Sequence, residues 1–228
     1  MNKLERSTFN FLSLLGKNNN REWFNKNKEL YLKAHENVID FAESLLMEMR
    51  GHDDIETPSG KKSLFRIYRD VRFSKDKSPY KNHFSGSFKR AGQLLRGGYY
   101  FHLEPGNVMI AGGFFSPAKE DLLRIREEIS ADDQPLREIL NEPDFKKAFG
   151  VLQGEQLKTA PKGFDKDHPA IDLIRYKQFY VTHKFEDADV FSSEFAKIIS
   201  QTFSLLRPYF NYLSDVLTTD ANGQALIK

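Results

Sequence analysis

The hydrophobic spacing of this chain of 228 residues changes from helical to alternating and back to helical. Apolar residues recur at helical spacing in residues 4–15 and from Arg21 to about Arg50, and helical spacing returns after Pro117. Between these stretches, apolar and polar residues alternate over several segments of residues 65–114. Strands that are grouped between runs of helices predict an α+β fold. We expect a mainly antiparallel sheet of about four to six strands, helices packed on one face, and long N- and C-terminal helices.

Four segments in the middle of the chain have the alternation expected of strands. The first runs from Phe65 to Phe73 and is interrupted at Arg69, which falls on the apolar side. That position predicts either a bulge or an arginine paired with a carboxylate or a ligand. The others cover about residues 84–88, 99–104 and 107–114, and Pro105 and Gly106 between the last two are typical of a type II turn in a hairpin. A further strand is expected at residues 179–182.

Helix signals flank these strands on both sides. Asn20 is a plausible N-cap for the helix that we expect from Arg21 to about Arg50. Later helices are expected at about residues 117–130, 136–140, 143–149, 170–176 and 192–217, and Pro208 should kink or divide the last one. Because no repeat or break in composition marks a boundary, we expect one domain over residues 1–228.

The composition limits the chemistry of the chain. Cysteine is absent, which excludes disulfides, a thiol nucleophile and cysteine-ligated metal centres. The 20 Phe and nine Tyr residues must supply much of the core packing. The first 20 residues lack the apolar run and cleavage site of a signal peptide, and no stretch reaches the ~18 apolar residues of a membrane helix. We therefore expect a cytoplasmic protein that does not enter the membrane.

Positive charge is concentrated in one part of the chain. Residues 61–96 include eleven basic and two acidic residues, although the net charge of the whole chain is +2. Such a segment favours an anionic partner, and a basic loop that is balanced by acidic helices is the alternative.

The alternation of the predicted strands also predicts a polar face on the sheet. In an antiparallel meander, the face away from the core would gather arginine, histidine, hydroxyl and carboxylate side chains, including the hydroxyl groups of Ser85 and Tyr100. We expect this face to bind a small ligand that bears a phosphate or a carboxylate, although an antiparallel sheet also has polar residues wherever it faces water. The residues expected to bind the ligand are Arg66, Arg69, Arg72, Lys75, Lys81, His83, His102 and Glu104.

Two other interpretations of the same residues remain open, an enzyme and a nucleic-acid-binding protein. A hydrolase-like or transferase-like enzyme would use His83 or His102 as a base and Arg66 to stabilise negative charge. A nucleic-acid-binding protein would use the cations of residues 66–81 together with Phe73 and Tyr80, and this is the weaker alternative because the pI is near 8.6.

His83, His102 and Glu104 have donor types that suit a metal, but hydrogen bonds across strands account for them better. Because no nucleotide-binding motif occurs, we expect no cofactor. Because no recurrent His-x-His motif or Asp-rich loop accompanies these residues, we expect no bound metal. The sequence leaves open whether the protein is an enzyme and which oligomer it forms.

Several longer motifs resemble a known family. These are Asn19-Asn20-Arg21-Glu22-Trp23-Phe24, the whole of residues 65–81, and the hairpin of residues 100–106. They resemble the conserved hypothetical proteins catalogued as domain of unknown function 2461. Residues 162–164, 167–169 and 175–177 look like the C-terminal signature of the same family. The resemblance covers nearly the whole chain, and it implies no activity, substrate, cofactor or catalytic residue.

Overall fold

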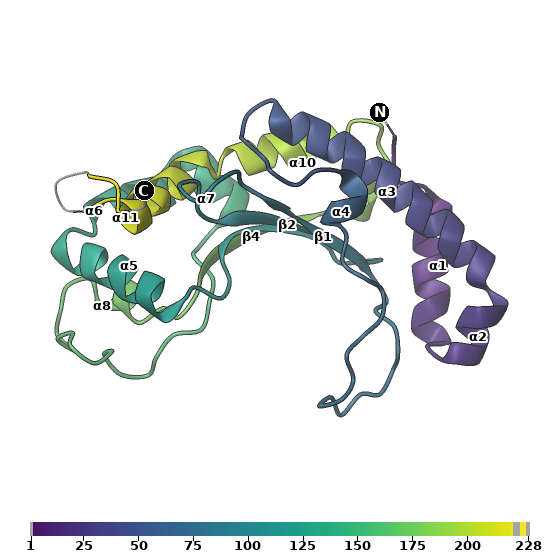
Figure 1. The fold of residues 1–228 in the computed structure, drawn as a ribbon, viewed down its shortest axis with the longest axis horizontal. Helices are drawn as coiled ribbons and strands as arrows, with labels where there is room; N and C mark the ends of the chain where they lie inside the picture. The colour runs from purple at the N-terminus through teal and green to yellow at the C-terminus, as the bar shows by residue number, and fades with distance from the viewer. Residues whose placement is uncertain (1, 221–223, 227–228) are drawn as a thin grey trace. The chain divides into compact units, whose positions relative to one another are not determined.

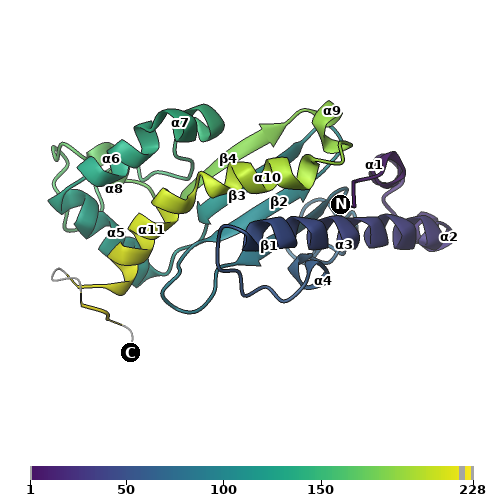
Figure 2. The same ribbon diagram turned by 90° about the horizontal axis from the view of Figure 1, so that it is seen from above.

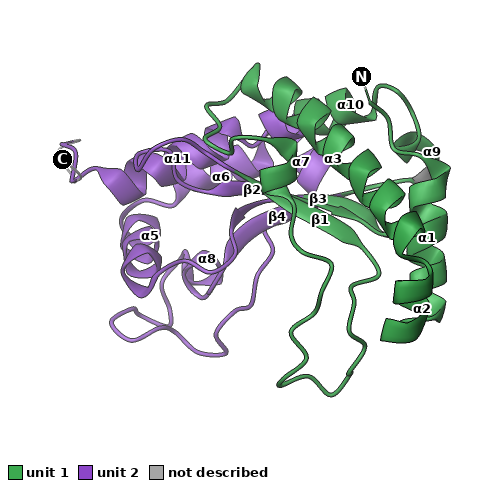
Figure 3. Ribbon diagram, turned by 45° about the vertical axis from the view of Figure 1, so that its right-hand side comes forward, with its two compact units in different colours: residues 1–88, 100–110, 184–201 green, residues 89–99, 111–183, 202–228 purple. Residues whose placement is uncertain are grey.

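The computed structural model describes residues 2–220 and 224–226, so Met1 and Lys228, the ends of the predicted domain, lie outside it. The chain forms two compact units (Figure 3). Unit 1 comprises residues 1–88, 100–110 and 184–201, and unit 2 comprises residues 89–99, 111–183 and 202–228. Strand residues of the same sheet belong to both units, so no linker marks the boundary.

The elements in chain order are α1 Arg6–Lys17, α2 Arg21–Lys26, α3 Lys28–Arg50, α4 Gly60–Ser63, β1 Phe84–Lys89, β2 Gly98–Leu103, β3 Val108–Phe114, α5 Lys119–Ala131, α6 Gln134–Asn141, α7 Pro143–Phe149, α8 Ile171–Ile174, β4 Phe179–Phe185, α9 Asp187–Val190, α10 Phe195–Ser204 and α11 Arg207–Thr218.

The sheet has four antiparallel strands in the order β1-β2-β3-β4. The α+β class and the antiparallel sheet are therefore confirmed. The predicted hairpin is confirmed as well: the N–H of Asn107 donates to the carbonyl of Glu104 at 2.9 Å. Gly106 has φ of +75°, the conformation that a type II turn requires at its third residue. Alternate residues of β2 and β3 are buried, as expected for strands with one face against the core.

In unit 1, α3, α4 and α10 lie on one face of the strands (Figures 1 and 2). The buried face of α3 includes Val38, Phe41 and Leu45, and the ring of Phe41 stacks on Phe195 of α10 with centroids 5.8 Å apart. α1 packs against α3. Phe84 of β1 lies against Phe11 of α1, so aromatic rings join the helices to the sheet.

In unit 2, α11 packs against α5 and α6. The hydroxyl of Tyr209 is fully buried and donates to the carbonyl of Phe179 at 3.0 Å, which joins α11 to β4. No helix in the described parts of the chain is both long enough and apolar enough to cross a lipid bilayer.

Two predicted helices are divided in the structure. The helix expected from Arg21 to Arg50 breaks at Asn27, whose side-chain amide donates to the carbonyl of Trp23 at 2.9 Å and competes with the helical backbone. Asn20 is the N-cap of α2, as predicted, and it accepts from the N–H of Trp23 at 2.9 Å. The C-terminal helix is divided into α10 and α11 with Pro208 in the first turn of α11, so the predicted effect of this proline is confirmed.

The strand predicted from Phe65 to Phe73 is wrong. These residues form one arm of a long loop, with isolated bridges at Leu64 and Tyr68 instead of a ladder. The alternation arises because Ile67 is buried between exposed residues, and Phe73 at the end of the pattern is 95% exposed. The expected sheet therefore lacks its first strand, and β1 begins at Phe84.

Candidate functional site

The loop of residues 64–83 positions the predicted site. Figure 1 shows it projecting beyond the end of the sheet, and its two arms are partly paired. The N–H of Phe65 donates to Ser85 at 2.9 Å, and the N–H of Lys81 donates to Ile67 at 2.8 Å. Residue 65 therefore pairs with residue 85 and residue 67 with residue 81, so a segment of two residues in the first arm pairs with a segment of four in the second. The second arm therefore contains two extra residues and bulges out of the pairing, and the side chains of Asn82 and His83 meet Glu104 and His102.

His102 of β2 is held at both ring nitrogens. Its Nε2 lies 3.0 Å from Oε2 of Glu104, and its Nδ1 lies 3.0 Å from the hydroxyl of Tyr100. Asn82 donates to Glu104 at 2.6 Å, and Asn107 donates to it at 2.9 Å. Burial alone would raise the pKa of Glu104, but the hydrogen bonds from Asn107 and His102 lower it overall.

These contacts define a directed chain of hydrogen bonds. An ionised Glu104 can only accept, so the proton of a neutral His102 lies on Nε2, and Nδ1 accepts from Tyr100. The hydroxyl of Tyr100 also hydrogen-bonds to the Ser85 side chain, and burial raises the pKa of Tyr100. Ser85, Tyr100, His102 and Glu104 are therefore linked in series, which fixes the orientation of the His102 ring.

His83 lies against this fixed ring. The centroids of the His83 and His102 rings are 4.1 Å apart, and the planes are inclined by 35°. Burial and the nearby His102 lower the pKa of His83 to about 4, so its imidazole is neutral at neutral pH. In the described parts of the chain, no hydrogen bond to the ring nitrogens of His83 is found. A neutral imidazole with available nitrogens can accept a proton or hydrogen-bond to a ligand.

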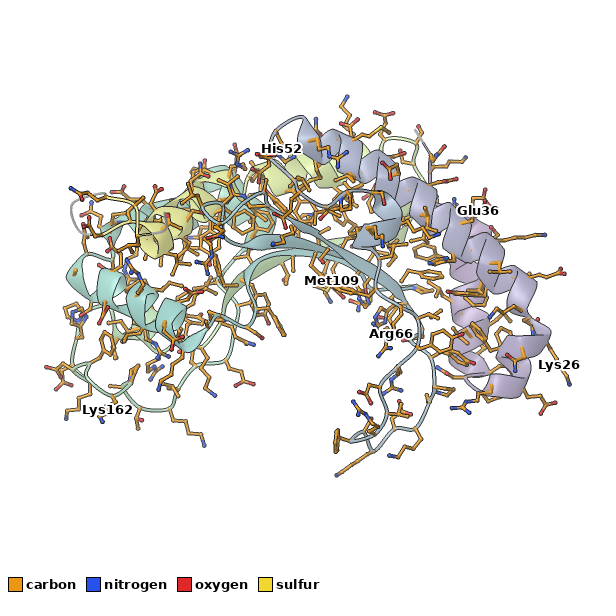
Figure 4. All side chains as sticks on the ribbon, viewed as in Figure 1. Lys26, Glu36, His52, Arg66, Met109 and Lys162 are labelled. Atoms are coloured by element: carbon orange, nitrogen blue, oxygen red, sulfur yellow. The ribbon has the colours of Figure 1, made fainter. Side chains whose placement is uncertain are left out.

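Lys81 lies near this histidine pair, and Arg66 lies near Lys81. Burial lowers the pKa of Lys81, and the positive charge of Arg66 lowers it further, so the two cations repel each other. Lys81 also contributes to the lowered pKa of His83. The ammonium of Lys81 lies 5.6 Å from the centroid of the Phe65 ring. Figure 4 shows Arg66 where the loop leaves the sheet.

The other predicted cations lie elsewhere in the loop. Arg69 is paired with Asp76 and donates to the carbonyl of Ser78 at 3.2 Å, so it is a half-buried arginine paired with a carboxylate. Arg72 pairs with Asp70 at 2.7 Å. Lys75 is exposed in the outer part of the loop. The structure therefore brings together five of the eight predicted residues: Arg66, Lys81, His83, His102 and Glu104.

Two of the residues that hold the site were missed at the sequence level. Asn107 follows the predicted turn and is three residues from Glu104, so hairpin geometry could have identified it. Asn82 lies 22 residues from Glu104, and only the bulge brings the two side chains together. Tyr100 and Ser85 were expected on the polar face but not as partners of His102.

The structure also bears on the two alternatives that need particular side chains. Within the described residues, no group of three or more acidic or histidine side chains is arranged to hold a metal ion. Tyr80, one of the two rings expected to stack on bases, is buried and stacks on Phe24 with centroids 4.0 Å apart. Of the two rings, only Phe73 is available to a partner.

The fold and the site together define an α+β protein in which a basic loop meets a pair of adjoining histidines at the edge of an antiparallel sheet. A family model described as "Conserved hypothetical protein (DUF2461)" matches residues 7–212, and the chain belongs to this family. No curated protein matches the chain, and no solved structure does. The family resemblance seen in the sequence is therefore confirmed.

Proposed function

We propose that the protein binds a small ligand bearing a phosphate or a carboxylate, held by Arg66, Lys81 and His83. The observation that carries this proposal is that two cations without carboxylate partners among the described residues lie close enough to repel each other: burial lowers the pKa of Lys81, and the charge of Arg66 lowers it further. Neither Arg66 nor Lys81 forms an ion pair within the described residues. An anion placed between them would relieve this repulsion and accept hydrogen bonds from both.

The rest of the loop supports the choice of these two cations. Arg69 and Arg72 already have carboxylate partners, Asp76 and Asp70. Hydrogen bonds from Ser78 and Arg69 hold the pKa of Asp76 well below its usual range, so that carboxylate remains ionised. Arg69 and Arg72 are thus compensated by carboxylates, whereas in the part of the chain that the structure describes neither Arg66 nor Lys81 has a carboxylate in an ion pair.

The histidine pair supplies the rest of the proposed site. Because His102 is fixed by Tyr100 and Glu104, it gives His83 a rigid surface to lie against. His83 is neutral in the free protein, and a bound anion would raise its pKa and favour its protonated form. Ligand binding would then take up a proton, and affinity for the anion would increase as pH falls toward 6.

Titration with inorganic phosphate and with citrate tests the proposal. At low ionic strength we expect both anions to raise the thermal unfolding temperature, and sodium chloride at equal ionic strength to have a smaller effect. Arg66→Ala and Lys81→Ala should each weaken binding at least tenfold. Lys75→Ala is the matched control, because it removes an exposed lysine of the same loop away from the histidines, and it should bind nearly as well as the parent chain. Absence of binding, or equal losses in all three variants, would contradict the proposal.

A second candidate function is favoured by the state of His83. A neutral imidazole with available nitrogens beside two cations is the arrangement in which a base activates water or a hydroxyl group against an anionic substrate. In this hydrolase-like or transferase-like enzyme, His83 rather than His102 would act as the base, because both ring nitrogens of His102 are occupied. Hydrolysis of generic phosphate monoesters and carboxylate esters that is lost in His83→Gln but retained in Lys75→Ala would support it, and an inactive parent chain would leave the binding function in place.

A further inference from the structure

Phe73 is an exposed aromatic side chain in the outer part of the 64–83 loop. Its exposed fraction is 95%, the highest among the exposed large hydrophobic residues of the described chain. Single exposed apolar residues are common, but a phenylalanine that is almost entirely in water loses the whole benefit of burial. A fold that keeps such a ring exposed can offer it to a partner.

The loop around Phe73 is braced by its own polar contacts. Arg69 pairs with Asp76 across the loop, and the side chain of Asp76 accepts from the N–H of Ser78 at 2.9 Å. The ammonium of Lys77 donates to the carbonyl of Val71 at 3.0 Å. These contacts hold the chain on both sides of Phe73, so presenting the ring costs little further conformational entropy.

A pocket with complementary properties lies in unit 2. It has a volume of about 450 Å³, within the range of about 300–1,000 Å³ that accommodates small ligands. Its apolar wall consists of Ile139, Phe145, Leu205 and Pro208, and its other lining residues are Glu138, Glu142, Asp144 and Ser204. None of the three carboxylates forms an ion pair with a lysine or arginine within the described part of the chain. Glu142 accepts from the N–H of Phe145 at 2.7 Å and caps α7.

We propose that Phe73 of one copy of this chain inserts into the pocket between α6, α7 and the start of α11 of a second copy. The volume of the pocket accommodates an aromatic ring, and its apolar wall would remove that ring from water. Arg72 pairs with Asp70, whereas Lys75 and Lys77 leave the outer loop with uncompensated positive charge. The carboxylates that line the pocket supply the opposite charge. The loop of one copy is therefore complementary in charge and in hydrophobic character to the pocket of another copy, so we take a second copy as the partner.

The contact joins different surfaces of the two copies, so it is a head-to-tail contact. Each copy keeps one loop and one pocket available after the first contact, and longer assemblies can form. One loop in one pocket buries less surface than the roughly 1,200 Å² of the smallest stable interfaces, so the association is weak and requires high protein concentration. Because both surfaces are charged, salt weakens it.

Sedimentation velocity of the full chain over a range of concentrations tests this contact. At low salt we expect the mean sedimentation coefficient to rise with concentration, and ~0.5 M sodium chloride to reduce the rise. Phe73→Ala should lower the association constant at least tenfold. The matched control is Phe115→Ala, which removes another exposed phenylalanine, 65% exposed, and should associate like the parent chain.

The pocket is tested by reversing the charge of two of its exposed residues. Glu138→Lys combined with Asp144→Lys leaves the cap at Glu142 intact and should abolish association. Glu36→Lys combined with Asp40→Lys, on the exposed surface of α3, changes the charge equally and should have little effect.

Mixing the two defective variants is the decisive measurement. The Phe73→Ala variant keeps an intact pocket, and the Glu138→Lys/Asp144→Lys variant keeps an intact loop. A one-to-one mixture should therefore form dimers, joined by one good contact and unable to extend, although each variant alone is monomeric. The proposal is overturned if the parent chain is monomeric throughout, if Phe73→Ala associates normally, or if the mixture does not form dimers. Binding of the monomeric parent chain to anionic vesicles or single-stranded DNA through Phe73 would assign the loop to a membrane or a nucleic acid instead.

Discussion

Arg66 and Arg90 come from the same basic stretch of the sequence but lie in opposite environments. Arg66 is exposed where the 64–83 loop leaves the sheet, and no hydrogen bond of its side chain is found within the described residues. Arg90 follows β1 and is 0% exposed. Its guanidinium donates to the carbonyl of Arg96 at 3.0 Å, and to the side chains of Asn211 at 3.2 Å and Ser214 at 3.3 Å.

The difference shows that a run of basic residues in a sequence is not one basic surface. Arg90 supplies hydrogen bonds to acceptors on helix α11 and in the 89–97 segment of unit 2. Its guanidinium also lies 5.2 Å from the centroid of the Phe210 ring. A buried arginine with such partners contributes to folding and is not available to a ligand. Arg66 is exposed and has no carboxylate in an ion pair within the described chain, so it can meet an anion, whereas Arg90 cannot; the two arginines should therefore respond in opposite ways to mutation.

The largest effect is expected for Arg90→Ala. The substitution leaves a cavity and removes the partners of the Arg96 carbonyl, Asn211 and Ser214 in the interior, which should lower the free energy of unfolding by about 3–5 kcal/mol. Urea denaturation measures this loss, with phosphate binding to the folded fraction expected to be unchanged. A loss below about 1 kcal/mol would show that the buried contacts of Arg90 contribute little to folding.

Two glycines of the same segment provide a matched pair for the next effect. Gly92 and Gly97 both have positive φ, +70° and +86°, so alanine is strained at either position. A Cβ at Gly97 would also lie 2.7 Å from the Phe210 ring, whereas a Cβ at Gly92 would meet nothing within 4 Å. We expect Gly92→Ala to cost about 1 kcal/mol and Gly97→Ala about 2–3 kcal/mol. Equal losses would mean that Phe210 moves away readily and that the packing around Arg90 is looser than its burial indicates.

The sequence predicts the elements that have strong local signals. Period-two alternation identified β1, β2 and β3, and Pro105 with Gly106 identified the β2–β3 hairpin, because a type II turn depends on local residues. The break at Asn27 and the loss of the expected strand at residues 65–73 depend on particular side-chain contacts. In the second case the alternation was real, but the neighbouring arm of the loop pairs with this segment only through isolated bridges, so no ladder forms.

The sequence predicted the types of residue in the candidate site but not the hydrogen bonds and ion pairs between them. Parity placed Tyr100, His102 and Glu104 on one face, and the structure links these three by hydrogen bonds. The alternation of apolar and polar residues could not reveal the bulge that brings Asn82 and His83 to them, since a bulge depends on the register between the two arms of the 64–83 loop. Nor could it show that Arg69 and Arg72 are occupied by Asp76 and Asp70. Whether these residues bind a ligand stays a prediction.

A smaller effect on stability is expected from the titration of His83. Its pKa is about 4 in the folded chain, whereas an ordinary histidine has a pKa of 6.5, so between these values the unfolded chain binds a proton that the folded chain does not. Stability attributable to His83 is therefore intact above pH 6.5 and lost as pH falls toward 4. After allowance for the solvent screening of a half-exposed group, the loss is about 1–2 kcal/mol.

The variant His83→Gln isolates this contribution. His35 also has a lowered pKa, through burial and the charge of Lys61, so the parent chain alone does not identify the responsible histidine. Between about pH 7 and 4.5, the urea midpoint of the parent chain should fall more steeply than that of the variant, because only the parent loses the His83 contribution. If the urea midpoints of both chains change equally with pH, groups other than His83 are responsible for the pH dependence.

The smallest effect on stability is expected at Arg66, and it tests the electrostatic basis of the proposed site. Arg66→Ala should change the free energy of unfolding by less than about 0.5 kcal/mol, as is usual for exposed residues, in contrast to Arg90→Ala. It should nevertheless raise the pKa of Lys81, because the repulsion from Arg66 is removed while the burial of Lys81 is kept. Side-chain NMR of Lys81 between about pH 8 and 12 measures this change, and Lys75→Ala should leave that pKa where it is in the parent chain. If the pKa of Lys81 does not rise in Arg66→Ala, the two cations are not close enough to hold one anion, and the ligand site would have to be sought away from this loop.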